Sequence, residues 1–212
     1  MSFKNSVCWS CRGVTPAGVF CHTCDTILPM DPGENFFQLF HMEPAFDLDL
    51  AALEQHYREL QKKLHPDFFA QRSAMERRIS MERVIRLNEA WQTLQDPLLR
   101  SGYLLQTLGW QAVKPEPDPE FLYEVMALRE TLEEVNPMES NALSRLAALR
   151  SEAKARMQTT IEKVSEMFRV YLTEKNGEIL SKIARYLDRM RYHRRYLEEL
   201  DRLEDQAFEQ ES

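Results

Sequence analysis

The chain has 212 residues, of which 43% are hydrophobic and 29% charged, a composition typical of a folded globular protein with one or two domains. Its formal net charge of −7 disfavours general nucleic-acid binding, because phosphates are neutralised by basic side chains. No apolar run approaches the roughly 18 residues of a membrane span, so the sequence predicts no membrane insertion. Six glycines and ten prolines are few for an all-β chain with many turns.

The cysteines of the chain all lie near its N-terminus, in a C-x2-C-x9-C-x2-C pattern formed by Cys8, Cys11, Cys21 and Cys24. Two such pairs can supply four thiolates to a tetrahedral metal ion and leave no open position, which is typical of structural zinc. The segment is too short to bury a core, so the metal would supply most of its folding free energy. We therefore predict a tetracysteine metal-binding module over residues 1–31 that holds one structural zinc ion, with a small β-turn or hairpin between the two cysteine pairs.

Other interpretations of these cysteines stay open at this point. Iron or a labile cluster also takes four thiolates. Two disulfides or a redox dithiol are further alternatives, although a reducing cytosol disfavours them. His22 lies beside Cys21 and is a spare nitrogen ligand, but four cysteines already complete a tetrahedron.

Two amphipathic helices are predicted next in the chain. The first begins at residue 50 and has one apolar face, made of Leu50, Leu53, Tyr57, Leu60 and Leu64. Asp49 is a good N-cap for it, and Pro66 ends it, because proline disfavours helical backbone at the residue before it. The second helix repeats the spacing in Met81, Val84, Leu87, Trp91 and Leu94 and ends near Asp96. The two would form an antiparallel hairpin whose tip is the stiff, polar loop His65-Pro66-Asp67.

The tip and the helix before it carry candidate contact residues. The carboxylate of Asp67 is suited to a bidentate arginine of a partner, although a simple capping role for the next segment is the alternative. Arg58 and Lys62 lie four residues apart on the face opposite the apolar one, with Lys63 at its side. They form either a basic docking surface or, with acidic residues four positions earlier, ordinary pairs within the helix.

Prolines and acidic residues alternate over residues 109–118 and predict a stiff connector. Asp118 and Pro119 then fit the N-cap and first position of a new helix. Three helices are predicted beyond it, over residues 119–135, 139–174 and 178–205, and their short connections indicate an antiparallel three-helix bundle over residues 119–207. The acidic tail from residue 204 to residue 212 is expected to fray.

The first bundle helix has two apolar faces. One face is continuous and suited to packing in the bundle: Phe121, Val125, Leu128, Leu132 and Val135. Leu122, Tyr123 and Met126 centre on the opposite side, where a surface helix normally carries polar residues. Large apolar side chains on an outward face indicate a partner site, unless another part of the chain covers them.

The sequence shows no catalytic motif: it contains no phosphate-cradling glycine loop, no nucleophile motif and no HExxH-like pair of histidines. Arginines 189, 191, 194 and 195 are interleaved with acidic residues, which predicts a solvated helix face and not a nucleic-acid site. We therefore expect no enzyme activity. Only Lys4 and Arg12 are basic near the N-terminus, so neither a secretory signal nor an arginine-rich transit peptide is predicted.

Residues 34–105 resemble the J domain, the module with which co-chaperones stimulate ATP hydrolysis by DnaK-type chaperones. The motif His65-Pro66-Asp67 and its helical hairpin carry the resemblance, together with the stretches Asn35-Phe36-Phe37-Gln38-Leu39-Phe40, Asn88-Glu89-Ala90-Trp91 and Leu94-Gln95-Asp96-Pro97-Leu98-Leu99-Arg100. With the helices that follow, the whole chain resembles the HscB family, the J-type co-chaperones of iron–sulfur cluster assembly. The resemblance implies a mainly α fold: a J domain over residues 34–108 and a C-terminal three-helix bundle, preceded by a small zinc-type module with four cysteine ligands.

The resemblance also implies partners and contact residues. A DnaK/HscA-type chaperone would contact His65, Pro66, Asp67, Arg58, Lys62 and Lys63. An IscU-like iron–sulfur scaffold would contact the bundle through Leu122, Tyr123, Met126, Glu130, Glu134 and Tyr186. Ala127 stands where relatives can carry an acidic residue, which would weaken the electrostatic part of that contact. Tyr186 has a second interpretation as a residue at the edge of the bundle core.

The implied function is that of a co-chaperone that delivers the scaffold to the chaperone and stimulates its ATPase to promote cluster transfer. A homodimer is a further expectation. The implied location is the bacterial cytoplasm, or an organellar matrix if a presequence has been removed. Two alternatives stay open: a J-domain co-chaperone for another client, and a metal- or redox-sensing helical adaptor.

Overall fold

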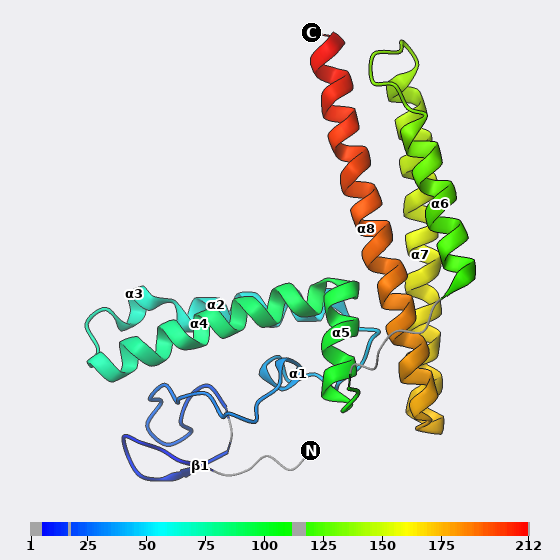
Figure 1. Cartoon of the computed structure of the whole chain (residues 1–212). Coiled ribbons are helices and arrows are strands. Elements are labelled where there is room, and N and C mark those ends of the chain that lie inside the picture. The colour runs from blue at the N-terminus through cyan, green and yellow to red at the C-terminus, as the bar shows by residue number, and fades with distance from the viewer. Residues whose placement is uncertain (1–5, 17, 112–117, 212) are drawn as a thin grey trace. The chain divides into compact units, whose positions relative to one another are not determined.

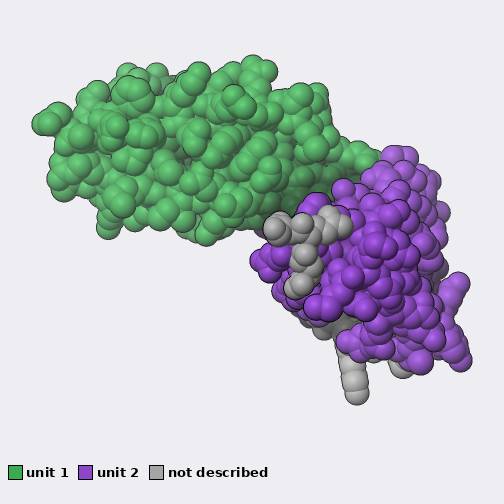
Figure 2. All heavy atoms as spheres, turned by 90° about the horizontal axis from the view of Figure 1, so that it is seen from above, with its two compact units in different colours: residues 1–100 green, residues 101–212 purple. Residues whose placement is uncertain are grey.

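The structure is a computed structural model and describes residues 6–16, 18–111 and 118–211. It divides into two compact units, residues 1–100 and residues 101–212 (Figure 2). The predicted connector falls largely on residues 112–117, which lie outside the described residues. None of the described helices is both long enough and apolar enough to span a bilayer.

The N-terminal segment of the first unit is built from short pairings around each cysteine pair. Strands β1 (Ser6–Val7) and β2 (Val14–Thr15) are antiparallel, with Val7 opposite Val14. They enclose the first cysteine pair, and an isolated bridge between Phe20 and Ile27 encloses the second. A hairpin is therefore present, but it encloses the first cysteine pair, whereas the prediction placed it between the two pairs. The enclosing pairings hold each pair of cysteines at the tip of a turn.

The rest of the first unit is a helical hairpin with short helices at its ends. Helix α1 (Phe36–Leu39) precedes α2 (Leu50–Leu64), and a single turn, α3 (Pro66–Phe69), leads into α4 (Ala74–Gln95). Figure 1 shows α2 and α4 side by side; α5 (Pro97–Thr107) follows in the chain, and the division between the two units falls within it. The predicted start and end of α2 are confirmed: Asp49 caps it by accepting hydrogen bonds from the amides of Ala51 and Ala52, and the helix ends two residues before Pro66.

The buried face of α4 agrees with the predicted one only in part: Leu87 and Leu94 are buried and Val84 and Trp91 are half-buried, as predicted. The structure buries Ile79, Arg83, Leu87, Ala90 and Leu94, which follow one another at spacings of three and four residues. Met81, which the periodicity placed on the core face, is 59% exposed, and Leu50 at the start of α2 is 48% exposed. Apolar periodicity did not identify the whole buried face of α4, because a charged residue, Arg83, occupies one of its central positions.

The second unit contains three long helices: α6 (Pro119–Glu133), α7 (Ala142–Glu174) and α8 (Gly177–Glu211). Figure 1 shows them as the predicted antiparallel bundle, in which α7 and α8 run alongside each other. Its core includes Leu128, Val135, Leu146, Tyr196 and Leu200. The expectation of a frayed tail is wrong for the described residues, because α8 continues to residue 211 and buries Ala207 at 2% exposure.

Candidate functional site

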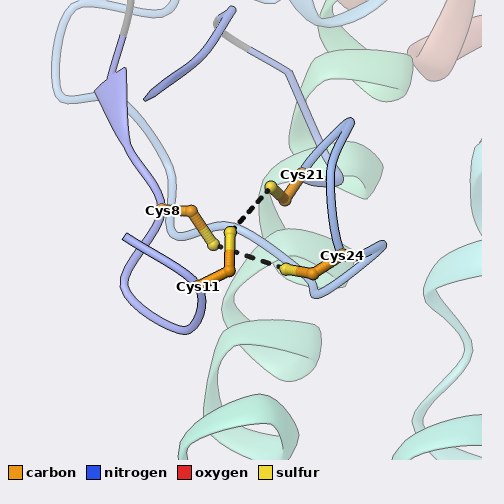
Figure 3. Close-up of side chains that lie close together, drawn as sticks. All are labelled: Cys8, Cys11, Cys21 and Cys24. Carbon is orange, nitrogen blue, oxygen red and sulfur yellow. Dashed lines mark hydrogen bonds between the residues drawn. The ribbon is translucent and has the colours of Figure 1, made fainter. Parts of the chain in front are cut away.

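The four cysteines form one cluster, to which each of the two turns contributes a pair (Figure 3). All four Sγ atoms lie within 4.8 Å of one another, and Cys8–Cys24 and Cys11–Cys21 are separated by 3.7 and 3.8 Å. Zinc–sulfur bonds of about 2.3 Å in a tetrahedron require sulfur–sulfur distances of about 3.8 Å. The sulfur atoms are therefore spaced to hold one metal ion of that size.

The surroundings of two of the sulfur atoms, those of Cys21 and Cys24, favour thiolates. Hydrogen bonds with Thr26 lower the pKa of Cys24 to about 6, and the backbone amide of Thr23 lowers the pKa of Cys21. For Cys11 the amide of Gly13 lowers the pKa, but the other thiols and desolvation raise it by more, to about 11. A bound cation would offset the effect of the neighbouring thiols that raises the pKa of Cys11, because the thiolate is the form that ligates metal. The donor set thus fits a soft divalent ion.

The predicted tip loop projects from the end of the hairpin. His65 both ends α2 and caps α3: its Nδ1 accepts a hydrogen bond from the amide of Asp67 at 3.3 Å and lies 3.5 Å from that residue's carboxylate. The side chain of Asp67 is 89% exposed. At the base of the loop, the Ser80 hydroxyl on α4 donates to the carbonyl of Leu64 at 2.7 Å. Since His65 supplies the cap, the carboxylate of Asp67 is presented to solvent on an anchored loop.

The basic residues of α2 are all exposed. Arg58 pairs with Glu54 at 2.5 Å, which is the local pairing that the sequence left open. Lys62 and Lys63 lie in the last turn of α2, directly before the tip. The positive charge of this surface is thus greatest next to the tip loop.

The outward face of α6 is apolar, as predicted. Leu122, Tyr123 and Met126 are 60%, 75% and 59% exposed. On the opposite side Leu128 and Val135 are buried, and the other three predicted packing residues of this helix are half-buried. Glu130 and Glu134 are exposed further along the helix, where Glu134 lies 3.8 Å from Arg145.

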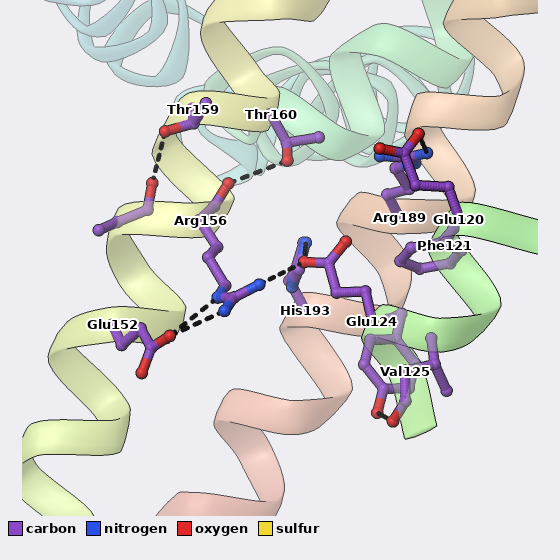
Figure 4. A network of polar contacts seen from close by, with 12 residues as sticks. Glu120, Phe121, Glu124, Val125, Glu152, Arg156, Thr159, Thr160, Arg189 and His193 are labelled. Carbon is purple, nitrogen blue, oxygen red and sulfur yellow. Dashed lines mark hydrogen bonds and ion pairs between the residues drawn. The ribbon is translucent and has the colours of Figure 1, made fainter. Parts of the chain in front are cut away.

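Behind this apolar face, polar contacts connect α6 to α7 and α8 (Figure 4). The carboxylate of Glu124 lies 2.9 Å from Arg156 on α7 and 3.8 Å from His193 on α8. The Tyr192 hydroxyl donates to the carbonyl of Val125 at 3.1 Å. The helix that carries the apolar face is therefore held to the bundle partly by charged and hydrogen-bonding groups.

Arg189 was expected on a solvated helix face, and this prediction is wrong. Its side chain is only 15% exposed, because it donates to the carboxylate of Asp118 at 2.7 Å and stacks 5.1 Å from the rings of both Phe121 and Tyr186. Tyr186 is half-buried, and Lys163 lies 5.9 Å from its ring. One guanidinium thus connects the start of α6 to the predicted aromatic contact on α8.

Sequence reasoning missed several buried polar residues, and two of them bear on the candidate sites. His193 is 1% exposed, and burial lowers its pKa. Arg83 is 2% exposed and donates hydrogen bonds to carbonyl groups of residues 18, 28 and 29. Their spacing from apolar residues could have indicated that they are buried. Arg83 lies four residues from both Ile79 and Leu87, and His193 lies three from both Met190 and Tyr196, all of them buried.

These features define the class of the protein: a helical protein with a J-type hairpin, a tetracysteine module and a long bundle. Residues 117–201 match the family described as the HSCB C-terminal oligomerisation domain. The chain is 34% identical to the co-chaperone protein HscB homolog of Colwellia psychrerythraea, over 82% of this chain and 99% of that one. It is also 34% identical to the human iron–sulfur cluster co-chaperone protein HscB, over 83% of this chain and 76% of that one.

Solved structures agree with the sequence comparisons. The chaperone HscB from Vibrio cholerae superposes with a TM-score of 0.71 at 32% identity, over 82% of this chain and 99% of that one. The crystal structure of human co-chaperone protein HscB superposes with a TM-score of 0.72 at 32% identity, over 88% of this chain and 95% of that one. The chain belongs to the HscB family of iron–sulfur cluster co-chaperones. The expectations of a mainly α fold and of this family are confirmed.

Proposed function

We propose that the protein binds an IscU-like iron–sulfur scaffold, delivers it to a DnaK/HscA-type chaperone and stimulates the ATPase of that chaperone to promote cluster transfer. The observation that carries the proposal is the exposed carboxylate of Asp67 on an anchored loop, in a chain that has a second, apolar exposed surface elsewhere. Two separate surfaces on one chain are what coupling a client to a chaperone requires.

The chaperone surface comprises His65, Pro66 and Asp67, with the basic residues Arg58, Lys62 and Lys63 beside them. Asp67 would accept an arginine of the chaperone in a charge-assisted hydrogen bond. The lysines would attract an acidic surface and raise the association rate. Arg58 contributes less than the lysines, because Glu54 already neutralises it.

The scaffold surface comprises Leu122, Tyr123 and Met126 of α6, with Glu130, Glu134 and Tyr186 around them. Exposed Leu, Tyr and Met side chains on one helix face supply the apolar centre of an interface, and the acidic residues supply its rim. Tyr186 would contact the scaffold through the exposed edge of its ring, since Arg189 and Lys163 already contact that ring.

The remaining assignments follow from the same proposal. Residues 1–31 form the metal module, 34–108 the J domain, 109–118 the connector and 119–207 the scaffold-binding bundle. Zinc is the proposed metal, held as one structural ion. The protein has no catalysis of its own and works in the bacterial cytoplasm, or in an organellar matrix; either reducing compartment suits four free thiols. Self-association into a homodimer is part of the proposal.

The test is single-turnover ATP hydrolysis by the chaperone with the scaffold present and with this protein as wild type, Asp67→Asn or Asp205→Asn. Loss of a hydrogen bond to a charged partner predicts a decrease of about 10-fold or more in stimulation for Asp67→Asn. Asp205 is exposed on α8, and its substitution controls for the loss of a surface charge. Equal stimulation by wild type and Asp67→Asn would refute the role of the tip, and stimulation that is independent of the scaffold would indicate another client.

A further inference from the structure

The guanidinium of Arg83 is buried in the middle of α4 and bonded to backbone carbonyls distant in sequence. Nε donates to the carbonyl of Leu28 at 2.5 Å, and Nη2 donates to those of Pro29 at 2.9 Å and Gly18 at 3.0 Å. The carboxylate of Glu34 lies 3.7 Å from Nη1. A fully buried charge is tolerated only when such partners surround it.

These acceptors belong to the residues that flank the second turn of the tetracysteine module on both sides. The side chain of Leu28 is packed with the metal-ligand candidates Cys8 and Cys21 in one buried cluster. Its backbone amide donates to the carbonyl of Val19 at 2.9 Å, and the Trp9 indole donates to the carbonyl of Ile27 at 2.8 Å. The carbonyl groups that Arg83 needs are therefore positioned by the folded module.

The module depends on metal for its fold. Residues 6–31 have two-residue strands, and their buried hydrophobic cluster contains Leu28 and two of the four sulfur ligands themselves. A segment of this size folds around a metal ion, and without one it has too little apolar surface to stay folded. Loss of the ion would thus withdraw the carbonyl acceptors of Arg83 and leave its buried guanidinium with the Glu34 carboxylate nearby but without those hydrogen bonds.

The same part of α4 anchors the tip loop. Ser80, three residues before Arg83 and on the adjacent turn, donates to the carbonyl of Leu64, the last residue of α2. Ile79 and Leu87, each four residues from Arg83, are fully buried in the hairpin. A disturbance at Arg83 would therefore act on the turn of α4 that holds the end of α2 directly before His65.

We propose that the tetracysteine module is a metal-dependent docking element of the J-type hairpin and that Arg83 transmits its metal occupancy to α4 and the tip loop. The ligand class is a soft divalent cation that four thiolates bind. With the ion bound, the module supplies carbonyl acceptors to Nε and Nη2 of Arg83, and the hairpin is rigid. Without it, α4 and the tip loop open locally, and stimulation of the chaperone falls. Only this last step rests on the function proposed above.

Hydrogen–deuterium exchange of the full chain tests the coupling without any chaperone. We would compare the chain loaded with zinc and the chain stripped by a chelator under reducing conditions, with thiol titration to confirm that the four cysteines are empty. Exchange in residues 74–95 and 50–64 is expected to accelerate about 10-fold or more on stripping, as for local unfolding, while residues 142–174 of α7 stay unchanged. Unchanged exchange in residues 74–95 would overturn the proposal.

Two variants on α4 test whether the coupling passes through Arg83. Arg83→Met keeps a flexible, unbranched apolar side chain but removes the charge that needs the carbonyl groups, so stripping should no longer accelerate exchange in residues 74–95. Arg78→Met is the matched control, because the Arg78 side chain is 65% exposed, and it should respond to stripping as the wild type does. An Arg83→Met chain that responds like the wild type would overturn the role of Arg83. If that variant fails to fold, the comparison of the zinc-loaded and stripped wild-type chains still decides whether metal occupancy is coupled to α4.

The chaperone assay distinguishes a failure of the metal-dependent docking role from a failure of the proposed co-chaperone function. Stimulation by the zinc-loaded chain that falls several-fold on stripping supports both. Accelerated exchange on stripping, with no stimulation even by the loaded chain, supports the docking role and refutes the co-chaperone function. Stimulation that is the same with and without metal would overturn the control of the tip loop by the module.

Discussion

The guanidinium of Arg189 donates two hydrogen bonds to one carboxylate oxygen of Asp118, at 3.2 Å from Nε and 2.7 Å from Nη2. The same side chain of Asp118 caps α6 by accepting from the amide of Phe121 at 3.1 Å. One carboxylate thus starts the helix that carries the proposed scaffold surface and ties it to the middle of α8. The hydrogen bond from Arg189 lowers the pKa of Asp118.

Asp118→Asn should separate these two roles, because asparagine caps a helix about as well as aspartate but carries no charge. We expect a fall of about 1 kcal/mol in the free energy of unfolding at pH 7 for Asp118→Asn and about 2 kcal/mol for Asp118→Ala, which also loses the cap. Urea denaturation followed by circular dichroism measures both. Equal stability of Asp118→Asn and wild type at pH 7 would contradict the prediction.

The pH dependence of this contribution has a defined sign. The folded pKa of Asp118 is lowered, so its stabilisation is fully present above the ordinary aspartate pKa of about 4 and is lost as the pH falls through the folded value. The stability difference between wild type and Asp118→Asn should therefore disappear in acid. A difference that stayed constant as the pH falls through the acid range would exclude the ion pair as its origin.

His193 should make the bundle sensitive to mild acid. It is buried, with its pKa lowered by desolvation, and it faces Glu124 of α6, Arg156 of α7 and Arg189 of its own helix. In the unfolded chain this histidine takes up a proton below its ordinary pKa of about 6.5, whereas in the folded protein it stays neutral to lower pH. Its contribution to stability is therefore fully present above that pH and falls as the pH decreases toward the lowered folded pKa.

We expect wild type to lose up to about 1 kcal/mol of unfolding free energy between about pH 7.5 and about pH 5.5 through this residue, and His193→Gln to lose correspondingly less. Tyr192→Phe is the control: it removes a hydrogen bond to Val125 but no group that titrates in this range, so its cost should be the same at both pH values. The same pH dependence in His193→Gln and wild type would show that histidine protonation is not the cause.

The apolar face of α6 should govern scaffold affinity. For Leu122→Ala combined with Met126→Ala we expect the dissociation constant for an IscU-like scaffold to rise about 10- to 100-fold, since apolar anchors at an interface centre contribute most of its binding energy. Leu172→Ala combined with Met138→Ala is a matched control, because both residues are 47% or more exposed elsewhere in the bundle unit. Isothermal titration calorimetry measures both. Equal effects of the two double variants on the dissociation constant would contradict the assignment of the apolar face of α6 as the scaffold-binding surface.

Metal stoichiometry should depend on the cysteines and not on the neighbouring histidine. Elemental analysis is expected to find about one zinc ion per wild-type chain, because four sulfur atoms complete a tetrahedron. Cys24→Ser should lose the ion, and His22→Ala should keep it. A His22→Ala chain with reduced zinc content would show that the histidine is a ligand.

The local features of the chain could be predicted because they depend on neighbours in sequence. The start of α2 at Asp49, its end before Pro66 and the start of α6 at Asp118 follow from capping and from proline geometry. The clustering of four cysteines follows from the spacing of two pairs. The outward apolar face of α6 follows from helical periodicity, which shows that the helix has two apolar faces even when the elements packed against it are not known.

Which side chains are buried was decided only by the tertiary structure. Periodicity assigned Met81 to the core and gave no role to Arg83, yet Met81 is exposed and Arg83 is buried, because carbonyl groups 54 to 65 residues earlier accept its hydrogen bonds. Arg189 was likewise expected in solvent but meets Asp118, 71 residues earlier. A sequence determines where helices begin and which faces they have, whereas the partner that makes burial of a charge tolerable comes from chain segments that only the folded structure brings together.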